Sequence, residues 1–162
     1  MKENDRQFRF STTVLVRFGD MDAMGHVNNA KYLTYFEEAR IYYFQHVFGK
    51  RIEDLGDKSF ILAEATVKFR SALRGGDRLE VFLRVSRIGT KSFDMQYKIL
   101  HAENRTLIAE GSTVQVMYDY EKGTTIPIPD EMKTRIEKYE GLELSNLHIG
   151  STPGTSFHET QR

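Results

Sequence analysis

The chain has 162 residues, of which 40% are hydrophobic and 28% are charged, a profile typical of one soluble globular domain. Its 23 basic residues balance its 23 acidic residues, and a net charge of zero argues against a dedicated nucleic-acid-binding protein. The absence of cysteine excludes disulfides, thiolate zinc sites and a cysteine nucleophile. The N-terminus is charged and the chain has no apolar run of about 18 residues, so we expect no secretory signal, no membrane span and a cytoplasmic location.

The first predicted element is a strand at residues 9–17, which are rich in β-branched and apolar side chains. Residues 18–29 follow as a loop that contains two glycines, two aspartates and two asparagines. A long helix is predicted over residues 30–48, because apolar residues recur there at three- and four-residue steps. One of the two asparagines caps its start, and Gly49 ends it.

Four further strands are predicted after the helix, at residues 60–70, 79–88, 92–100 and 106–119. We expect them to form a meander, with a tight hairpin between the second and the third. A short surface helix is predicted at residues 130–140, followed by a disordered tail at residues 141–162, which are small and polar.

The fold class that follows is α+β, with a single domain over residues 1–140. In this domain a curved antiparallel sheet of about five strands wraps one long central helix, since nothing else in the chain can bury the helix's broad apolar stripe. Such a sheet leaves an edge strand open, so we expect a homo-oligomer, either a dimer or a tetramer.

The loop before the helix carries the residues of greatest chemical interest. Asp20, Asp22 and His26 lie within seven positions, and Gly25 allows the backbone to approach a ligand closely. The first N–H groups of a helix have no partner within it, so they can hold a carbonyl oxygen and its developing negative charge. A carboxylate beside such an oxyanion site suits acyl transfer. An acid near a helix start is also ordinary in structural terms, and we expect Asp20 to hold the loop through backbone N–H groups.

The segment from Val16 to Arg40 resembles the signature of the 4-hydroxybenzoyl-CoA thioesterase family, within the hotdog superfamily. Members typically carry an aromatic-x-Asp-x-Asp-x-x-Gly-His-Val-Asn-Asn run, then Tyr-Leu and a Phe-Glu-x-Ala-Arg helix. The matching residues here are Phe18, Asp20, Asp22, Gly25, His26, Val27, Asn28, Asn29, Tyr32, Leu33, Phe36, Glu37, Ala39 and Arg40. The resemblance implies a hotdog fold and an acyl-CoA thioesterase, which hydrolyses a thioester to a free acid and coenzyme A without a metal or redox cofactor.

The resemblance also implies the roles of the site residues. Asp22 is expected to be the catalytic carboxylate, as a nucleophile that forms an acyl-enzyme anhydride or as a general base on water. The backbone N–H near Gly25 is expected to polarise the thioester carbonyl, and His26 to orient substrate or water. Coenzyme A is expected across the outside of the sheet at a subunit interface, where a lysine supplies a charge for phosphate. The expected substrate-binding residues are Asn28, Tyr32, Glu64, Arg70, Lys91 and Ser92.

Two other functions remain open on the sequence alone. The acyl group can be attached to an acyl carrier protein rather than to coenzyme A, or the chain can be a non-catalytic acyl-CoA binding module. Single residues also have structural readings: His26 as a packed histidine and Glu64 as a solvent-facing strand acid. The remaining histidines have no ligand spacing, so no metal site is predicted.

Overall fold

The computed structural model describes residues 7–141, so the predicted tail lies outside the described residues except for Gly141. The elements, in chain order, are β1 (Phe10–Leu15), η2 (Phe18–Asp20), α1 (Asn29–Phe48), η3 (Ile52–Leu55), β2 (Lys58–Phe69), β3 (Arg78–Ile88), β4 (Ser92–His101), β5 (Leu107–Asp119), β6 (Thr124–Thr125) and α2 (Asp130–Glu140). The long helix, the five long strands and the short last helix therefore fall where the sequence predicts them.

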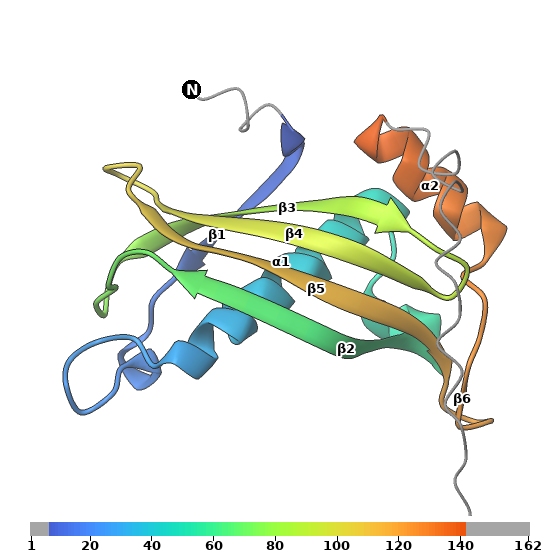
Figure 1. Cartoon of the computed structure of the whole chain (residues 1–162), viewed down its shortest axis with the longest axis horizontal. Coiled ribbons are helices and arrows are strands. Elements are labelled where there is room, and N and C mark those ends of the chain that lie inside the picture. Colours follow the sequence, from blue (N-terminus) through green and yellow to red (C-terminus); the bar gives the residue numbers. More distant parts are fainter. Residues whose placement is uncertain (1–6, 142–162) are drawn as a thin grey trace, which may run out of the picture.

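The strands form one antiparallel sheet in the order β1-β3-β4-β5-β2, with β6 beside β5 (Figure 1). The predicted meander of four strands is wrong, because β2 does not pair with β3 but lies beside β5. The sheet has six strands rather than about five, since the two-residue β6 adds to β5. In this order β1 and the 12-residue β2 are the two edge strands.

Helix α1 begins and ends as its terminal residues predict. The side chain of Asn28 accepts a hydrogen bond from the N–H of Ala30 at 2.9 Å, which satisfies one of the free amides of the first turn. Gly49 follows the last turn with φ 64°, a left-handed conformation that glycine adopts without steric cost.

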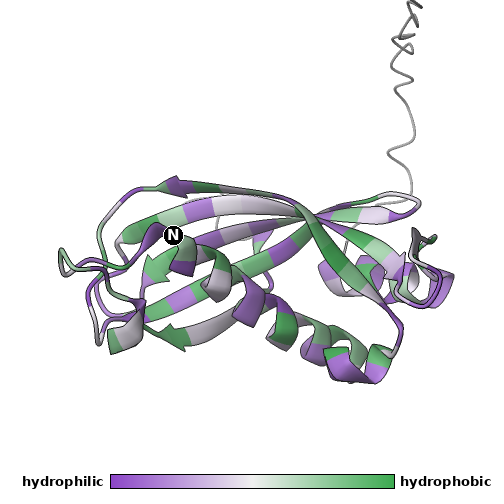
Figure 2. Cartoon of the chain, turned by 90° about the horizontal axis from the view of Figure 1, so that it is seen from below, coloured by the Kyte–Doolittle hydropathy of each residue, from purple (hydrophilic) through white to green (hydrophobic). Residues whose placement is uncertain are grey.

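The core lies between α1 and one face of the sheet (Figure 1). Apolar and polar residues alternate along the strands, so one face of the sheet turns toward α1 and the other toward solvent (Figure 2). The ring of Phe36 stacks on Tyr97 of β4, with ring centroids 4.1 Å apart. Gly111 of β5 makes this approach possible, because a Cβ at that position would lie 2.5 Å from the Phe36 ring.

The last helix is not only a surface element. α2 buries Met132, Ile136 and Glu140 and packs on α1 and β3, so the fold has two packed helices rather than one. Arg135 of α2 donates a hydrogen bond to the main-chain oxygen of Phe48 at 3.0 Å and so covers the C-terminal end of α1. Within residues 7–141, no helix has the length and apolar character needed to cross a membrane.

Candidate active site

The loop between β1 and α1 is closed at its base by main-chain hydrogen bonds. The N–H of Asn28 donates to the carbonyl of Asp20 at 2.9 Å, and Met21 and Val27 form an isolated antiparallel bridge. The loop is fastened to the segment after β2 by the N–H of Val27, which donates to the carbonyl of Leu73 at 3.2 Å. These contacts hold residues 20–28 in one compact turn at the head of α1.

The carboxylate of Asp22 is oriented by this turn. Its Oδ1 accepts hydrogen bonds from the N–H of Met24 at 2.8 Å and from the N–H of His26 at 3.1 Å. Among residues 7–141 no group donates to Oδ2. The side chain is exposed, so one oxygen is fixed by two amides while the other is available to a ligand.

The free amide at the head of the helix is not that of Gly25. The N–H of Gly25 donates to the carbonyl of Asp22 at 3.1 Å, and its φ of 77° forms the turn. The N–H groups of Ala30 and Lys31 donate to Asn28. Within the described part of the chain, the N–H of Asn29 has no hydrogen-bond partner, as expected for the first residue of a helix.

A hollow of about 270 Å³ lies beside the loop. One wall is the loop and the first turn of α1, and the other is the end of β2 with the segment that follows it. The edge of the Tyr32 ring meets Phe69, with centroids 4.9 Å apart, and burial raises the pKa of the Tyr32 phenol. The lining residues are His26, Val27, Asn29, Tyr32, Phe69, Arg70, Ser71, Ala72 and Leu73, so Asp22 lies on the same loop but outside the wall itself.

Some of the predicted substrate-binding residues lie far from this hollow. Arg70 lines the hollow and pairs with Glu110 at 3.2 Å. Lys91 lies in the turn between β3 and β4, where its Nζ donates to the Thr125 hydroxyl at 3.2 Å, and Ser92 begins β4. β5 separates these two groups by about 30 Å at 3.4 Å per residue, because Arg70 bonds to Ile108 and Lys91 to Met117.

Glu64 lies apart from both groups. It is exposed on β2, opposite Val114 of β5 and next to a β-bulge, and no ion pair forms at its carboxylate among the described residues. The same part of the chain contains no group of three histidine or acidic residues that can hold a metal ion.

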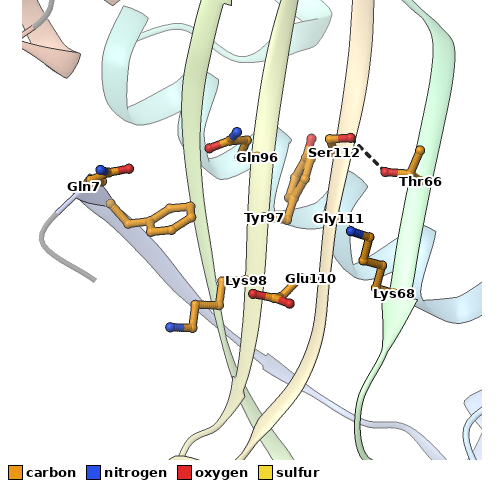
Figure 3. A pocket seen from close by; sticks show the side chains of 10 residues that line it. Gln7, Thr66, Lys68, Gln96, Tyr97, Lys98, Glu110, Gly111 and Ser112 are labelled. Carbon is orange, nitrogen blue, oxygen red and sulfur yellow. Dashed lines mark hydrogen bonds between the residues drawn. The ribbon is translucent and has the colours of Figure 1, made fainter. Parts of the chain in front are cut away.

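A second hollow of about 320 Å³ lies on the face of the sheet opposite α1 (Figure 3). Its floor is polar: the hydroxyls of Thr66 and Ser112 are 2.8 Å apart, and Lys68 and Glu110 are direct cross-strand neighbours. None of the predicted substrate-binding residues lines it, although it opens on the side of the sheet where coenzyme A is expected.

The structure also identifies contributors that the sequence does not single out. The Asn29 amide, the Phe69 ring and the Asp20–Tyr35 hydrogen bond of 2.9 Å all belong to the loop and its hollow. The alternation along β2 signals that Phe69 points toward α1, whereas no pattern in the sequence reports which main-chain amide is left free.

Two proteins of similar sequence are named as enzymes that hydrolyse thioesters. A 1,4-dihydroxy-2-naphthoyl-CoA hydrolase of Microcystis aeruginosa is 30% identical over 136 residues, 82% of this chain and 96% of that protein. A chloroplastic acyl-acyl carrier protein thioesterase of Arabidopsis thaliana is 27% identical over 122 residues, 74% of this chain and 63% of that protein. Both alignments cover most of the described residues.

A solved structure of similar fold contains a ligand. It is a thioesterase of Thermus thermophilus complexed with coenzyme A and zinc, 35% identical, with a TM-score of 0.73 over 83% of this chain and 96% of that one. The model of the thioesterase-like superfamily matches residues 16–136, which include the Asp22 loop, α1 and the whole sheet except β1. The chain therefore belongs to the thioesterase-like superfamily and has its hotdog fold.

Proposed function

We propose that this chain hydrolyses acyl-CoA thioesters and that Asp22 is the reacting carboxylate. The observation that carries the proposal is the geometry of the loop: Oδ1 of Asp22 is held by two amides, and Oδ2 has no donor among the residues that the structure describes. The same loop lines a hollow at the head of α1 through His26 and Val27. Membership of the thioesterase-like superfamily and the coenzyme A complex of a 35% identical thioesterase support the same reaction.

In the proposed reaction the thioester carbonyl oxygen accepts a hydrogen bond from the N–H of Asn29, which stabilises the negative charge that develops on it. As a nucleophile, Oδ2 of Asp22 forms a bond to the carbonyl carbon, the carbon–sulfur bond breaks, and coenzyme A leaves as the thiolate. Water then hydrolyses the resulting anhydride. As a general base, Asp22 instead takes a proton from water while the water oxygen bonds to the carbonyl carbon; the carbon–sulfur bond then breaks and coenzyme A leaves as the thiolate, which takes up a proton. Gly25 shapes the turn, and His26 lies where it can orient water or substrate.

The acyl group lies against Tyr32 and Phe69 in this proposal. Their edge-to-face pair lines the hollow next to the loop that carries Asp22, and 46% of the Phe69 surface is exposed. The Tyr32 phenol is protonated at neutral pH, as an ordinary tyrosine is, so in this proposal its hydroxyl can donate to a polar group of the substrate. Asn28 supports the site indirectly by capping α1.

We also infer that the complete site needs two chains. The edge strand β2 has one side unpaired and exposes Leu62 as well as Phe69, and α1 exposes Leu33 and Ile41. If two β2 strands pair antiparallel, the Phe69 end of one lies beside the Lys58 end of the other. The partner's Lys91 and the partner's Ser92 then approach the loop from which they are about 30 Å away within one chain.

Substitution of the carboxylate tests the proposal. Asp22→Asn keeps an oxygen that accepts the Met24 and His26 amides, so the fold remains, but it lacks the charge that attacks or accepts a proton. We expect kcat for thiol release from an acyl-CoA to fall by at least about 1,000-fold. Asp130→Asn, at an exposed aspartate on α2, is the matched control and should retain full activity. Near-normal turnover by Asp22→Asn would refute the assignment.

The second candidate function is hydrolysis of an acyl group carried on acyl carrier protein rather than on coenzyme A. The similarity to an acyl-acyl carrier protein thioesterase favours it, and the same arginine and lysine side chains suit either a nucleotide phosphate or an acidic carrier protein. One acyl group presented on coenzyme A and on the carrier decides between them, because the higher kcat/KM identifies the substrate. The cytoplasmic location remains a prediction from the sequence.

A further inference from the structure

The buried hydroxyl of Tyr35 contacts the loop that carries Asp22. Tyr35 lies on α1 with 2% of its surface exposed, and its hydroxyl donates to Oδ2 of Asp20 at 2.9 Å. The same Oδ2 accepts the N–H of Arg17 at 3.0 Å, and Lys31 lies 3.7 Å from Oδ1. Asp20, which is only 8% exposed, is therefore fixed by the helix on one side and by the start of the loop on the other.

Asp20 connects this buried contact to the reacting groups through its main chain. Its carbonyl accepts the N–H of Asn28, which closes the base of the loop one residue before the free amide of Asn29. Asp22 lies two positions after Asp20 and is turned back onto the loop by its bonds to Met24 and His26. Asp20 thus fixes the positions of the Asp22 carboxylate and the Asn29 amide, the oxyanion donor of the proposed reaction, relative to each other.

We propose that Tyr35 is a positioning residue, whose hydrogen bond to Asp20 sets the distance between the Asp22 carboxylate and the Asn29 amide. The inference rests on the proposed function, but its structural part, the fixing of residues 20–28, can be measured without any substrate. Reacting groups displaced by about 1 Å can lose up to about 100-fold in rate, so a contact remote from the substrate is able to control kcat.

α1 contains an internal control for a merely structural role. Eight residues later, about 12 Å along the helix, the hydroxyl of Tyr43 donates to Oε1 of Glu140 at 2.7 Å. Tyr43 is fully buried, and Glu140 is 6% exposed. The two hydrogen bonds share their chemistry and their burial, but the second one holds α2 and does not contact the Asp22 loop.

The experiment compares Tyr35→Phe with Tyr43→Phe in the full-length protein. Each variant loses one buried phenol–carboxylate hydrogen bond, so each should lower the melting temperature by about 2 to 5 °C. At 25 °C, Tyr35→Phe should lower kcat for thiol release from an acyl-CoA by about 10- to 100-fold with KM within about threefold of the parent. Tyr43→Phe should leave both constants unchanged.

Amide hydrogen exchange supplies the readout that needs no substrate. Tyr35→Phe should accelerate exchange at the Met24, His26 and Asn28 amides and leave α2 as it is, whereas Tyr43→Phe should accelerate exchange in α2 alone. Equal losses of kcat in the two variants, or an unchanged exchange rate of the loop in Tyr35→Phe, would overturn the positioning role. If the parent protein hydrolyses no thioester, the proposed function fails, while the exchange data still decide whether Tyr35 fixes the loop.

Discussion

The two ends of α1 use the same kind of contact, but one end remains exposed to solvent and the other is covered by a second helix. At each end a buried tyrosine of the helix donates to a buried carboxylate, Asp20 at the N-terminal end and Glu140 at the C-terminal end. Figure 1 shows the loop before α1 and the helix α2 at opposite ends of the long axis of the molecule. At the first end the carboxylate holds a loop whose own polar groups remain exposed. At the second it holds a helix that covers the end of α1.

The difference lies in whether another element covers the end of the helix. At the C-terminal end the carbonyl of Phe48 accepts a hydrogen bond from Arg135, and Met132 and Ile136 are buried beside it. At the N-terminal end the Asn29 amide and one oxygen of Asp22 have no partner among the described residues. An exposed carboxylate oxygen and an exposed helix amide can exchange water for a ligand, so the N-terminal end is the one suited to bind a ligand.

The largest expected effect is complementation, in which two impaired variants regain activity when their chains form mixed dimers. It tests whether the exposed end of α1 is completed by a second chain. Lys91→Ala should lower kcat/KM by about 10- to 100-fold through the loss of a charged phosphate contact. In a co-expressed equal mixture of Asp22→Asn and Lys91→Ala chains, half of the dimers are mixed, and one of their two sites is intact if the partner supplies the lysine. The mixture should then show about a quarter of the parent's activity at low substrate concentration.

The control for this experiment is the double variant of one chain, mixed with the parent in the same way. In this control a two-chain site leaves no intact site in the mixed dimers, so activity should be about a quarter of the parent's, whereas a same-chain site would give about half. In the mixture of the two single variants, by contrast, a lysine that acts on Asp22 of its own chain would leave no mixed dimer with an intact site. Activity would then stay at or below that of Lys91→Ala alone, which contradicts the two-chain site and leaves Asp22 untouched.

The smaller effect concerns the closed end and the pH dependence of stability. Burial raises the pKa of Glu140 above its ordinary value of 4.5, although the hydrogen bonds from Tyr43 and from the Val85 amide oppose this rise. The folded chain therefore binds more protons than the unfolded chain between the two pKa values. The free energy of unfolding should fall as the pH rises from about 4.5 through the folded pKa.

Glu140→Gln removes this titration while it keeps an oxygen that accepts both hydrogen bonds. Urea unfolding at several pH values from about 4 to 8 should show the variant gaining stability relative to the parent as the pH rises. Thiol release by the variant should be unchanged, since α2 lies away from the Asp22 loop. A stability difference that is independent of pH would show that folding does not raise the pKa of Glu140.

Most of the fold can be predicted from the sequence because it depends on local periodicity. Alternation marks the five long strands, the three- and four-residue repeat marks α1, and asparagine and glycine mark its ends. The partner of β2 cannot be predicted in this way, since strand pairing with β5 is a contact between distant segments. The burial of α2 escapes prediction for a similar reason: Met132, Ile136 and Tyr139 recur at helical steps, but this spacing does not report which distant elements they pack on, here α1 and β3.

The site divides along the same line. Asp22, Gly25 and His26 belong to one continuous motif, so they can be found together, and the structure places them in one turn. The free amide at Asn29 depends on which N–H groups the loop has already used, and side-chain identity does not report that. Lys91 and Ser92 are predicted to contact the phosphate end of coenzyme A, and the sequence does not report that they lie about 30 Å from the Asp22 loop in the same chain, a separation that depends on the sheet order.

Thiol release from a panel of aliphatic and aromatic acyl-CoAs by the unmodified protein tests the central claim most directly. We expect at least one member of the panel to be hydrolysed with kcat/KM of about 10⁴ M⁻¹s⁻¹ or more, in the ordinary range of enzymes, and with release of one free thiol per acid formed. Tight binding of acyl-CoAs without thiol release from any of them, on coenzyme A or on the carrier protein, would show a binding module and contradict the account.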